Sequence, residues 1–238
     1  MPDRRESWGL VLFDIDGTLC LSGGAGARAL ERALHELMDV REGLAGITLD
    51  GATDRAIMRA IFAAQGLDFD AALAEQVLAR YLDLLPEELR AGNGYRLMPG
   101  VADLLTRLTA HEIAFGLWTG NLVEGARAKL GHGGIWDPFA PPHFGGGFGS
   151  DAEERHEIVR VAIRRAEAQL GHPLASGDIL IVGDTPRDVA AALAVGVPCL
   201  GVATGRSSES QLREAGATYT FPTLDAPGVL SLLLAGRV

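Results

Sequence analysis

Several residue types are scarce in this sequence, and each scarcity narrows what the protein can be. Cysteine occurs only at Cys20 and Cys199, in no metal-binding or redox spacing, so we expect no disulfide framework and a reducing, cytoplasmic location. No apolar stretch approaches the roughly 20 residues that span a bilayer, and the first residues, MPDRRESWG, lack the apolar core of a signal peptide. Lysine occurs once, at Lys129, and every other basic side chain apart from histidine is arginine.

Positive charge is also in deficit. The 21 basic and 31 acidic residues give a net charge of 21 − 31 = −10, which argues against a nucleic acid or an anionic membrane surface as the main partner. The chain has 238 residues, 47% hydrophobic and 22% charged, which is ordinary for a globular protein and enough for one large domain or two modest ones.

Short apolar runs alternate with helical patterns over most of the chain. We predict strands at 10–13, within 113–121, and at 178–185, 197–205 and 217–221. The runs are continuous rather than alternating, which is typical of parallel strands buried on both faces. Apolar residues at helical spacing lie between them, so the sequence predicts a doubly wound, Rossmann-like α/β sheet.

Residues 22–94 interrupt this alternation. Three segments with helical spacing, at 27–38, 53–64 and 70–89, follow one another with no convincing strand. We therefore predict a core domain of residues 1–21 and 95–238 and an inserted all-helical domain of residues 22–94. The Gly-containing segments 22–26 and 91–100 are expected to serve as hinges, and the Gly- and Pro-rich stretch 131–149 to be a loop of the core.

Polar side chains follow the predicted strands at the point where each strand ends: Asp14 and Asp16, then Thr119 to Asn121, then Asp184 and Asp188, then Thr204. Each one alone is readily explained as a helix cap or turn residue. In a parallel sheet, however, the carboxyl ends of the strands meet at one edge, and clustered carboxylates are costly without a cation between them. Oxygen ligands suit a hard divalent ion, so we predict Mg²⁺.

The order of these motifs carries a family resemblance. It rests on DIDGT (14–18), WTGN (118–121), a later basic residue and GDTPRD (183–188), in that order. Together they resemble the haloacid dehalogenase-like (HAD) superfamily, with the phosphoglycolate phosphatase-like branch nearest in overall pattern. The resemblance covers nearly the whole chain, because residues 22–94 look like the family's small helical cap.

The resemblance implies a role for each strand-end residue. Asp14 is expected to attack phosphorus and Asp16 to move protons, with Mg²⁺ held by Asp14, Asp184 and Asp188 and by the backbone carbonyl of Asp16. The residues expected to bind the phosphoryl group are Gly17, Thr18, Thr119, Gly120 and Asn121.

The basic residue of the third motif departs from the common pattern, which has lysine at that point. Lys129 follows the second motif closely, inside a predicted helix, and we interpret it as a solvated helix residue. Arg155 precedes the helix that leads to the 178–185 strand, so we predict that Arg155 bridges the nucleophile and a phosphoryl oxygen. The alternative is that Arg155 lies exposed and pairs with Glu153 or Glu154.

In the insertion, GATDR (51–55) looks like the family's substrate-specificity loop, with Thr53 and Arg55 binding substrate. The alternative is a plain helix start capped by Thr53 or Asp54. We expect a monomer or homodimer that hydrolyses a small phosphorylated metabolite, with a phosphosugar mutase of the β-phosphoglucomutase kind as the alternative. A phosphoaccepting signalling receiver is a remote third, since receivers are shorter and lack DxDGT.

Overall fold

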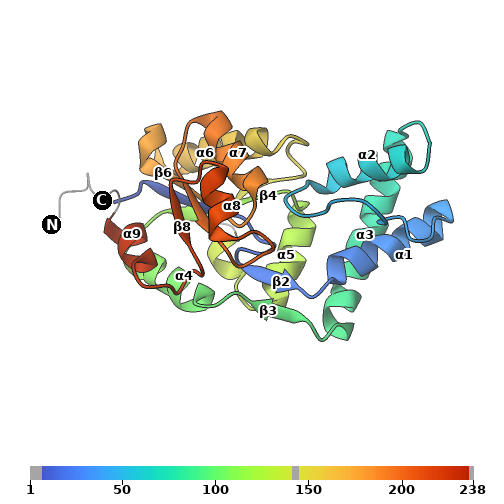
Figure 1. Cartoon of the computed structure of the whole chain (residues 1–238), viewed down its shortest axis with the longest axis horizontal. Coiled ribbons are helices and arrows are strands. Elements are labelled where there is room, and N and C mark those ends of the chain that lie inside the picture. Colours follow the sequence, from blue (N-terminus) through green and yellow to red (C-terminus); the bar gives the residue numbers. More distant parts are fainter. Residues whose placement is uncertain (1–6, 141–144, 236–238) are drawn as a thin grey trace.

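The computed structural model describes residues 7–140 and 145–235, and a six-stranded parallel sheet lies at its centre (Figure 1). The strand order is β5-β4-β1-β6-β7-β8. The bounds are β1 (Leu10–Phe13), β4 (Phe115–Thr119), β5 (Gly146–Phe148), β6 (Ile179–Gly183), β7 (Cys199–Val202) and β8 (Tyr219–Phe221). Each run predicted as a strand contains one of them, which confirms the α/β fold class.

Helices cover both faces of the sheet, and β1 shows why its residues are apolar without alternation. Val11 and Phe13 pack in a cluster with the helices α4 (Val101–Ala110), α5 (Val123–His132) and α9 (Val229–Ala235). Leu10 and Leu12 pack on the opposite face, with α6 (Arg155–Leu170), α7 (Pro186–Val195) and α8 (Glu209–Glu214). Because successive side chains of a strand point to opposite faces, a strand buried on both sides must be apolar throughout.

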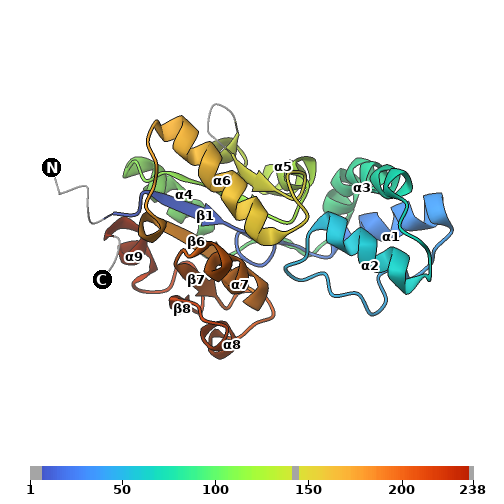
Figure 2. The same cartoon turned by 90° about the horizontal axis from the view of Figure 1, so that it is seen from above.

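The helices α1 (Ala25–Met38), α2 (Asp54–Ala64) and α3 (Ala71–Ala91) stand beyond one end of the sheet and have a hydrophobic cluster of their own (Figure 2). We refer to these three as the cap helices. Residues 22–26 and 91–100, which we predict to be hinges, join the core to the cap helices. The strand β2 (Cys20–Ser22), which ends where the first segment begins, pairs antiparallel with β3 (Tyr95–Leu97) in the second. Beyond this pair, Gly23 and Gly94 approach too closely for a side chain on either.

Residues 131–149 were predicted to be a loop, but they are not wholly one. Residues 141–144 lie outside the described part. The stretch contains the end of α5, the 3-10 turn η1 (Asp137–Phe139) and the edge strand β5, while a second 3-10 turn, η2 (Ser176–Asp178), precedes β6. The sequence did not predict β5 because two of its three residues are glycine, which is depleted in strands generally. Gly146 has φ 148°, and a Cβ on it would overlap the Leu117 carbonyl of β4. Within the described ranges, no helix has the length and apolarity to cross a membrane.

Gly146→Ala should therefore destabilise the protein by about 2 kcal/mol or more, because the added methyl group forces β5 away from β4. Gly131→Ala is the matched control. Gly131 lies in α5 with nothing within 4 Å of an added Cβ, so alanine there should be neutral or stabilising by up to about 1 kcal/mol. Urea unfolding of both variants measures the difference, and equal stabilities would contradict this account of β5.

Candidate active site

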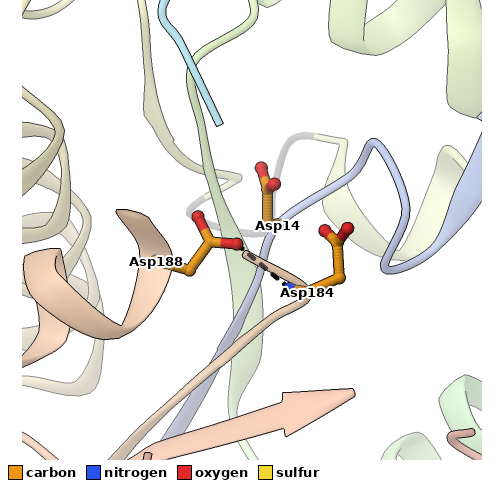
Figure 3. A group of neighbouring side chains, drawn as sticks. All are labelled: Asp14, Asp184 and Asp188. Carbon is orange, nitrogen blue, oxygen red and sulfur yellow. Dashed lines mark hydrogen bonds between the residues drawn. The ribbon is translucent and has the colours of Figure 1, made fainter. Parts of the chain in front are cut away.

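Three carboxylates meet at the carboxyl edge of the sheet (Figure 3). Asp14 follows β1, and its backbone N–H donates to the Val182 carbonyl at 2.9 Å, which continues the parallel pairing by one residue. Asp184 follows β6, and Asp188 lies in the first turn of α7. One oxygen from each lies within 4.8 Å of the others, and all three residues are buried.

Asp188 is both a helix cap residue and part of the site. Thr185 and Asp188 form a capping box at the start of α7. The Asp188 Oδ2 atom accepts hydrogen bonds from the backbone N–H groups of Asp184 (3.0 Å) and Thr185 (2.9 Å), and Oδ1 pairs with Arg155. Both oxygens of Asp188 already have partners, so Asp188 positions the groups around it. The carboxylate oxygens of Asp14 and Asp184 have fewer partners and are more accessible.

Asp184 lies in a cradle of backbone. An added Cβ at Gly17, which has φ +87°, or at Gly205 would overlap the Asp184 carboxylate. Thr18 is fully buried and donates its hydroxyl to Asp184 Oδ1 at 3.2 Å, so it orients this carboxylate from inside the protein. The cradle explains why glycine and threonine follow Asp16 in the first motif.

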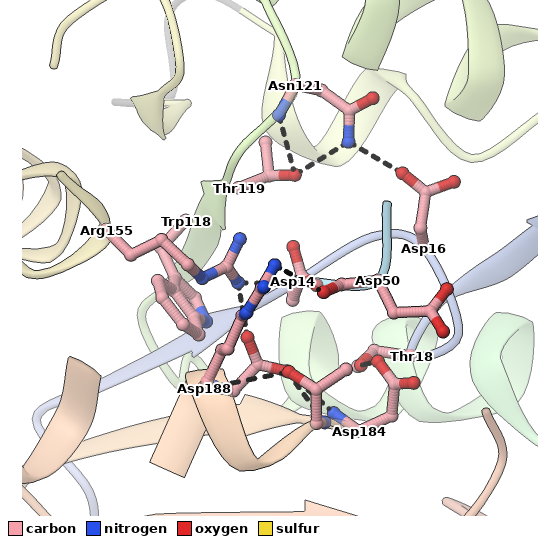
Figure 4. Close-up of polar contacts among 12 residues, drawn as sticks. Asp14, Asp16, Thr18, Asp50, Trp118, Thr119, Asn121, Arg155, Asp184 and Asp188 are labelled. Carbon is pink, nitrogen blue, oxygen red and sulfur yellow. Dashed lines mark hydrogen bonds and ion pairs between the residues drawn. The ribbon is translucent and has the colours of Figure 1, made fainter. Parts of the chain in front are cut away.

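Arg155, at the start of α6, is the basic group among these acids (Figure 4). Its Nη2 atom lies 3.6 Å from Asp14 Oδ2 and contacts Asp188 Oδ1, and its guanidinium lies over the Trp118 ring at 4.6 Å from the centroid. The alternative that Arg155 is exposed and paired with Glu153 or Glu154 is therefore wrong.

One arginine does not balance three carboxylates, and the pKa values reflect it. Burial raises the pKa of Asp14 to about 7; Arg155 opposes this shift, while Asp188 and Asp16 add to it. Burial, then the charges of Asp188 and Asp14, raise the pKa of Asp184 to about 9. A divalent cation would remove this cost, and the oxygen donors and the glycine cradle fit a hard ion.

Lys129 is not the solvated helix residue that we predicted. Its side chain is only 7% exposed, and its Nζ donates to Asp16 Oδ1 (2.8 Å), to Asp16 Oδ2 (2.6 Å) and to Asn121 Oδ1 (2.7 Å). Burial is the largest single effect and opposes its charge, but the negative charge and hydrogen bonds of Asp16, together with smaller contributions such as that of Asp54, outweigh burial and raise the pKa of Lys129. Helical spacing could have revealed this, because Lys129 lies on the same face of α5 as the buried residues Leu122 and Ala126.

Asn121 extends the contact to Thr119. Its Nδ2 donates to Asp16 Oδ2 and to Thr119 Oγ1, both at 2.8 Å, and its backbone N–H lies 3.3 Å from the same hydroxyl (Figure 4). Thr119 thus accepts from Asn121 while its own hydroxyl hydrogen is left to donate. These residues lie beside Asp14, which the sequence analysis expected of Thr119, Asn121 and Asp16.

Segment 51–55 lies against the loop after β4. The Asp54 backbone N–H donates to the Gly120 carbonyl (3.0 Å), and the Leu122 N–H donates to the Asp54 carboxylate (2.9 Å). A Cβ on Gly120 would overlap the Ala52 carbonyl, so glycine there permits this close approach, and Gly120 also lines the cavity over Asp14. Burial raises the pKa of Asp54 to about 6.

Thr53 and Arg55 do not hold the positions that a substrate-binding role predicts. Thr53 caps α2 by accepting from Ala56 N–H, and its hydroxyl donates to the Glu153 carbonyl at 3.0 Å. Arg55 pairs with Glu75 (3.2 Å) and with the Ser150 carbonyl (3.4 Å), and neither Thr53 nor Arg55 lines the cavity over Asp14. Thr53 is therefore the N-cap residue of α2, as the helix-start interpretation expected.

The cavity over Asp14 has a volume of about 520 Å³ and lies between the cap helices and the sheet edge. Its walls include side chains that the sequence analysis missed as site residues, namely Lys129, Tyr81, Asp54, Asp50, Arg96 and Arg206. Most of these come from the helical insertion or its junctions, where no strand end marks a functional position.

The architecture and the acidic site define a class, the phosphoryl-transferring α/β hydrolases with a helical cap. The chain belongs to a particular family within it, because residues 8–196 match the family model for haloacid dehalogenase-like hydrolases. A phosphoglycolate phosphatase of Rhodospirillum rubrum is 32% identical over 206 residues, covering 84% of this chain and 81% of that protein. A second, from Yersinia pseudotuberculosis, is 30% identical over 197 residues, covering 82% and 81%.

Solved structures agree on the fold. A hydrolase from Pseudomonas syringae superposes with a TM-score of 0.72 at 18% identity, covering 95% of this chain and 96% of that one. The family match and the named relatives identify the protein as a phosphoric monoester hydrolase of the HAD-like type.

Arg55→Ala should lower kcat/KM by a similar factor, about two- to fivefold, for every phosphate ester. Arg55 joins α2 to Glu75 and Ser150 rather than lining the cavity, so its loss loosens the cap without changing what the cavity contacts. The measurement is the ratio of kcat/KM for a phosphorylated metabolite to that for p-nitrophenyl phosphate. Arg59→Ala, which removes the Arg59–Glu153 pair, is the matched control, and a ratio that moves more than about fivefold only in Arg55→Ala would restore a specificity role.

Proposed function

We propose that the protein is a Mg²⁺-dependent phosphatase that hydrolyses a small phosphorylated metabolite through an aspartyl-phosphate on Asp14. One observation carries this proposal: Asp14 is 4% exposed at the floor of a cavity, with a guanidinium at 3.6 Å and two further carboxylates beside it. Burying one carboxylate among others costs free energy, and such arrangements are typical of catalytic sites.

In the first step, a carboxylate oxygen of Asp14 attacks phosphorus and the bond from phosphorus to the ester oxygen breaks. A proton from the Asp16 carboxyl group passes to that oxygen, which leaves as the alcohol. Arg155, 3.6 Å from Asp14, and Thr119, whose hydroxyl hydrogen is left to donate, both line the cavity and suit the phosphoryl oxygens.

In the second step, a water molecule attacks phosphorus and gives a proton to Asp16. The bond between phosphorus and Asp14 breaks, which releases phosphate and restores the carboxylate. Asp16 fits this exchange because its side chain is 42% exposed to the cavity, unlike that of Asp14, while Lys129 and Asn121 hold it from behind.

Asp14 and Asp184, with the Asp16 backbone carbonyl, would hold the metal, and Asp188 would support it from behind. The ion would neutralise the negative charge that otherwise keeps a phosphate ester away from Asp14. Mg²⁺ suits a site with few protein ligands better than Ca²⁺ does.

Hydrolysis is favoured over phosphosugar transfer because both named relatives at about 30% identity are phosphoglycolate phosphatases. The cavity volume suits a small metabolite of that kind. Cys20 and Cys199 are buried free thiols, which suits work in the reducing cytoplasm. A monomer or homodimer stays our prediction for the assembly.

Asp14→Asn should lower phosphate release at least about 10³-fold, because an amide cannot form the acyl phosphate. The folded state should persist, since asparagine is nearly isosteric and relieves burial of a charge. Asp103→Asn, an exposed change on α4, is the control and should behave as the parent protein. An Asp14→Asn protein that keeps more than a few per cent of activity would exclude the covalent route.

Activity should vanish after dialysis against EDTA and return with Mg²⁺ but not with Ca²⁺. Mg²⁺ binding should also release about one proton or more per protein at pH 7, because the raised pKa values of Asp14 and Asp184 leave those groups partly protonated until a cation displaces the protons. Calorimetry in two buffers of different ionisation enthalpy measures this release. Asp184→Asn should bind Mg²⁺ weakly, and tight binding by that variant would exclude Asp184 as a ligand.

A further inference from the structure

Lys129 is a buried cation that the proposed chemistry does not itself consume. Its ammonium has three hydrogens, and all three have acceptors: both oxygens of Asp16, and Asn121 Oδ1. No donor is left for a phosphoryl oxygen or for a substrate carboxylate. Lys129 therefore acts on the protein rather than on the substrate.

The contacts of Lys129 fix the orientation of Asn121. Because an ammonium is only a donor, the Asn121 carbonyl oxygen must face it, and the amide nitrogen then faces Asp16 and Thr119. Thr119 accepts from that nitrogen, so its own hydrogen points elsewhere. One lysine thus sets the orientation of both the Asp16 carboxylate and the Thr119 hydroxyl.

The protein holds Lys129 itself from two directions. On the core side, the Tyr95 hydroxyl of β3 donates to the Lys129 carbonyl at 2.9 Å. On the cap side, Tyr81 of α3 and Asp54 at the start of α2 line the same cavity as Lys129, and a Cβ built on Gly26 of α1 would lie 3.9 Å from both Nζ and the Tyr81 hydroxyl. All three cap helices therefore surround an amine that comes from α5.

We propose that Lys129 is the positioning residue for Asp16, and that it serves mainly the second step, in which water is activated. The inference rests on the proposed function. The carboxylate that Lys129 holds is the form in which Asp16 emerges from the first step, when it must face the attacking water. Without the amine, Asp16 loses two hydrogen bonds and Asn121 loses the contact that directs its amide.

The test separates the two steps with p-nitrophenyl phosphate, whose leaving group needs little help from an acid. Lys129→Met keeps the buried alkyl stem and removes the amine. We expect a burst of nitrophenolate near one equivalent per site, followed by steady turnover about 10- to 100-fold slower than in the parent, with phosphoenzyme accumulating. Arg127→Met, on the exposed face of α5, is the matched control and should show parental turnover.

Rescue of turnover by an added amine is a second measurement, and a merely structural role of Lys129 would not produce it. Lys129→Ala should regain turnover in a saturable way with ethylammonium, which can donate to Asp16, and not with tetramethylammonium, which has no N–H. Turnover of Lys129→Met within twofold of Arg127→Met would overturn the proposal, as would an equal loss of burst and turnover. If either of those results is found while Asp14→Asn is inactive, only the proposal for Lys129 fails and the phosphatase proposal stands. An active Asp14→Asn variant would refute the phosphatase proposal itself.

Discussion

The rest of the structure holds three carboxylates of like charge close together in a buried position. One carboxylate oxygen from each of Asp14, Asp184 and Asp188 lies within 4.8 Å of the others beneath the cavity, and Arg155 is the cation in contact with Asp14 and Asp188. Removing carboxylates from water costs several kcal/mol each unless partners compensate. Backbone donors and Arg155 compensate Asp188, Arg155 opposes the burial of Asp14, and Asp184, which has the Thr18 hydroxyl, keeps the most strongly raised pKa.

A parallel sheet makes such an arrangement possible. β1 and β6 are neighbours in register, so the residues that follow them, Asp14 and Asp184, emerge side by side. α7 then starts just beyond β6, and its capping box brings Asp188 back to the same point. The fold supplies rigid backbone on which repelling groups cannot move apart, which is what a preorganised site requires.

Much of this was accessible from the sequence. Apolar runs reveal buried strands, and strand ends reveal Asp14, Thr119 and Asp184, because local pattern and local chemistry coincide there. Lys129 was missed because its partners Asp16 and Asn121 lie 113 and 8 residues away, and a lysine on a helix is usually solvated. β5 was missed because the backbone of Leu117 leaves no room for a side chain at Gly146, and the Ile158 carbonyl of α6 leaves none at Gly147. These are tertiary constraints with no local signature. Thr53 and Arg55 were assigned to substrate because the helix start was recognised without knowing what it packs against.

The two chain segments that leave the sheet for the cap helices are paired as β2 and β3, with Gly23 and Gly94 almost touching beyond them. A ribbon of two hydrogen-bonded strands resists stretching and sideways shear but twists and flexes readily out of its plane. A swing of the cap helices about this ribbon is therefore the displacement that leaves the strand pairing intact. Such a swing would carry Tyr81 and Asp54 away from Lys129 together. Opening the cavity to solvent and removing the cap-side neighbours of the Lys129 amine would then occur at the same time.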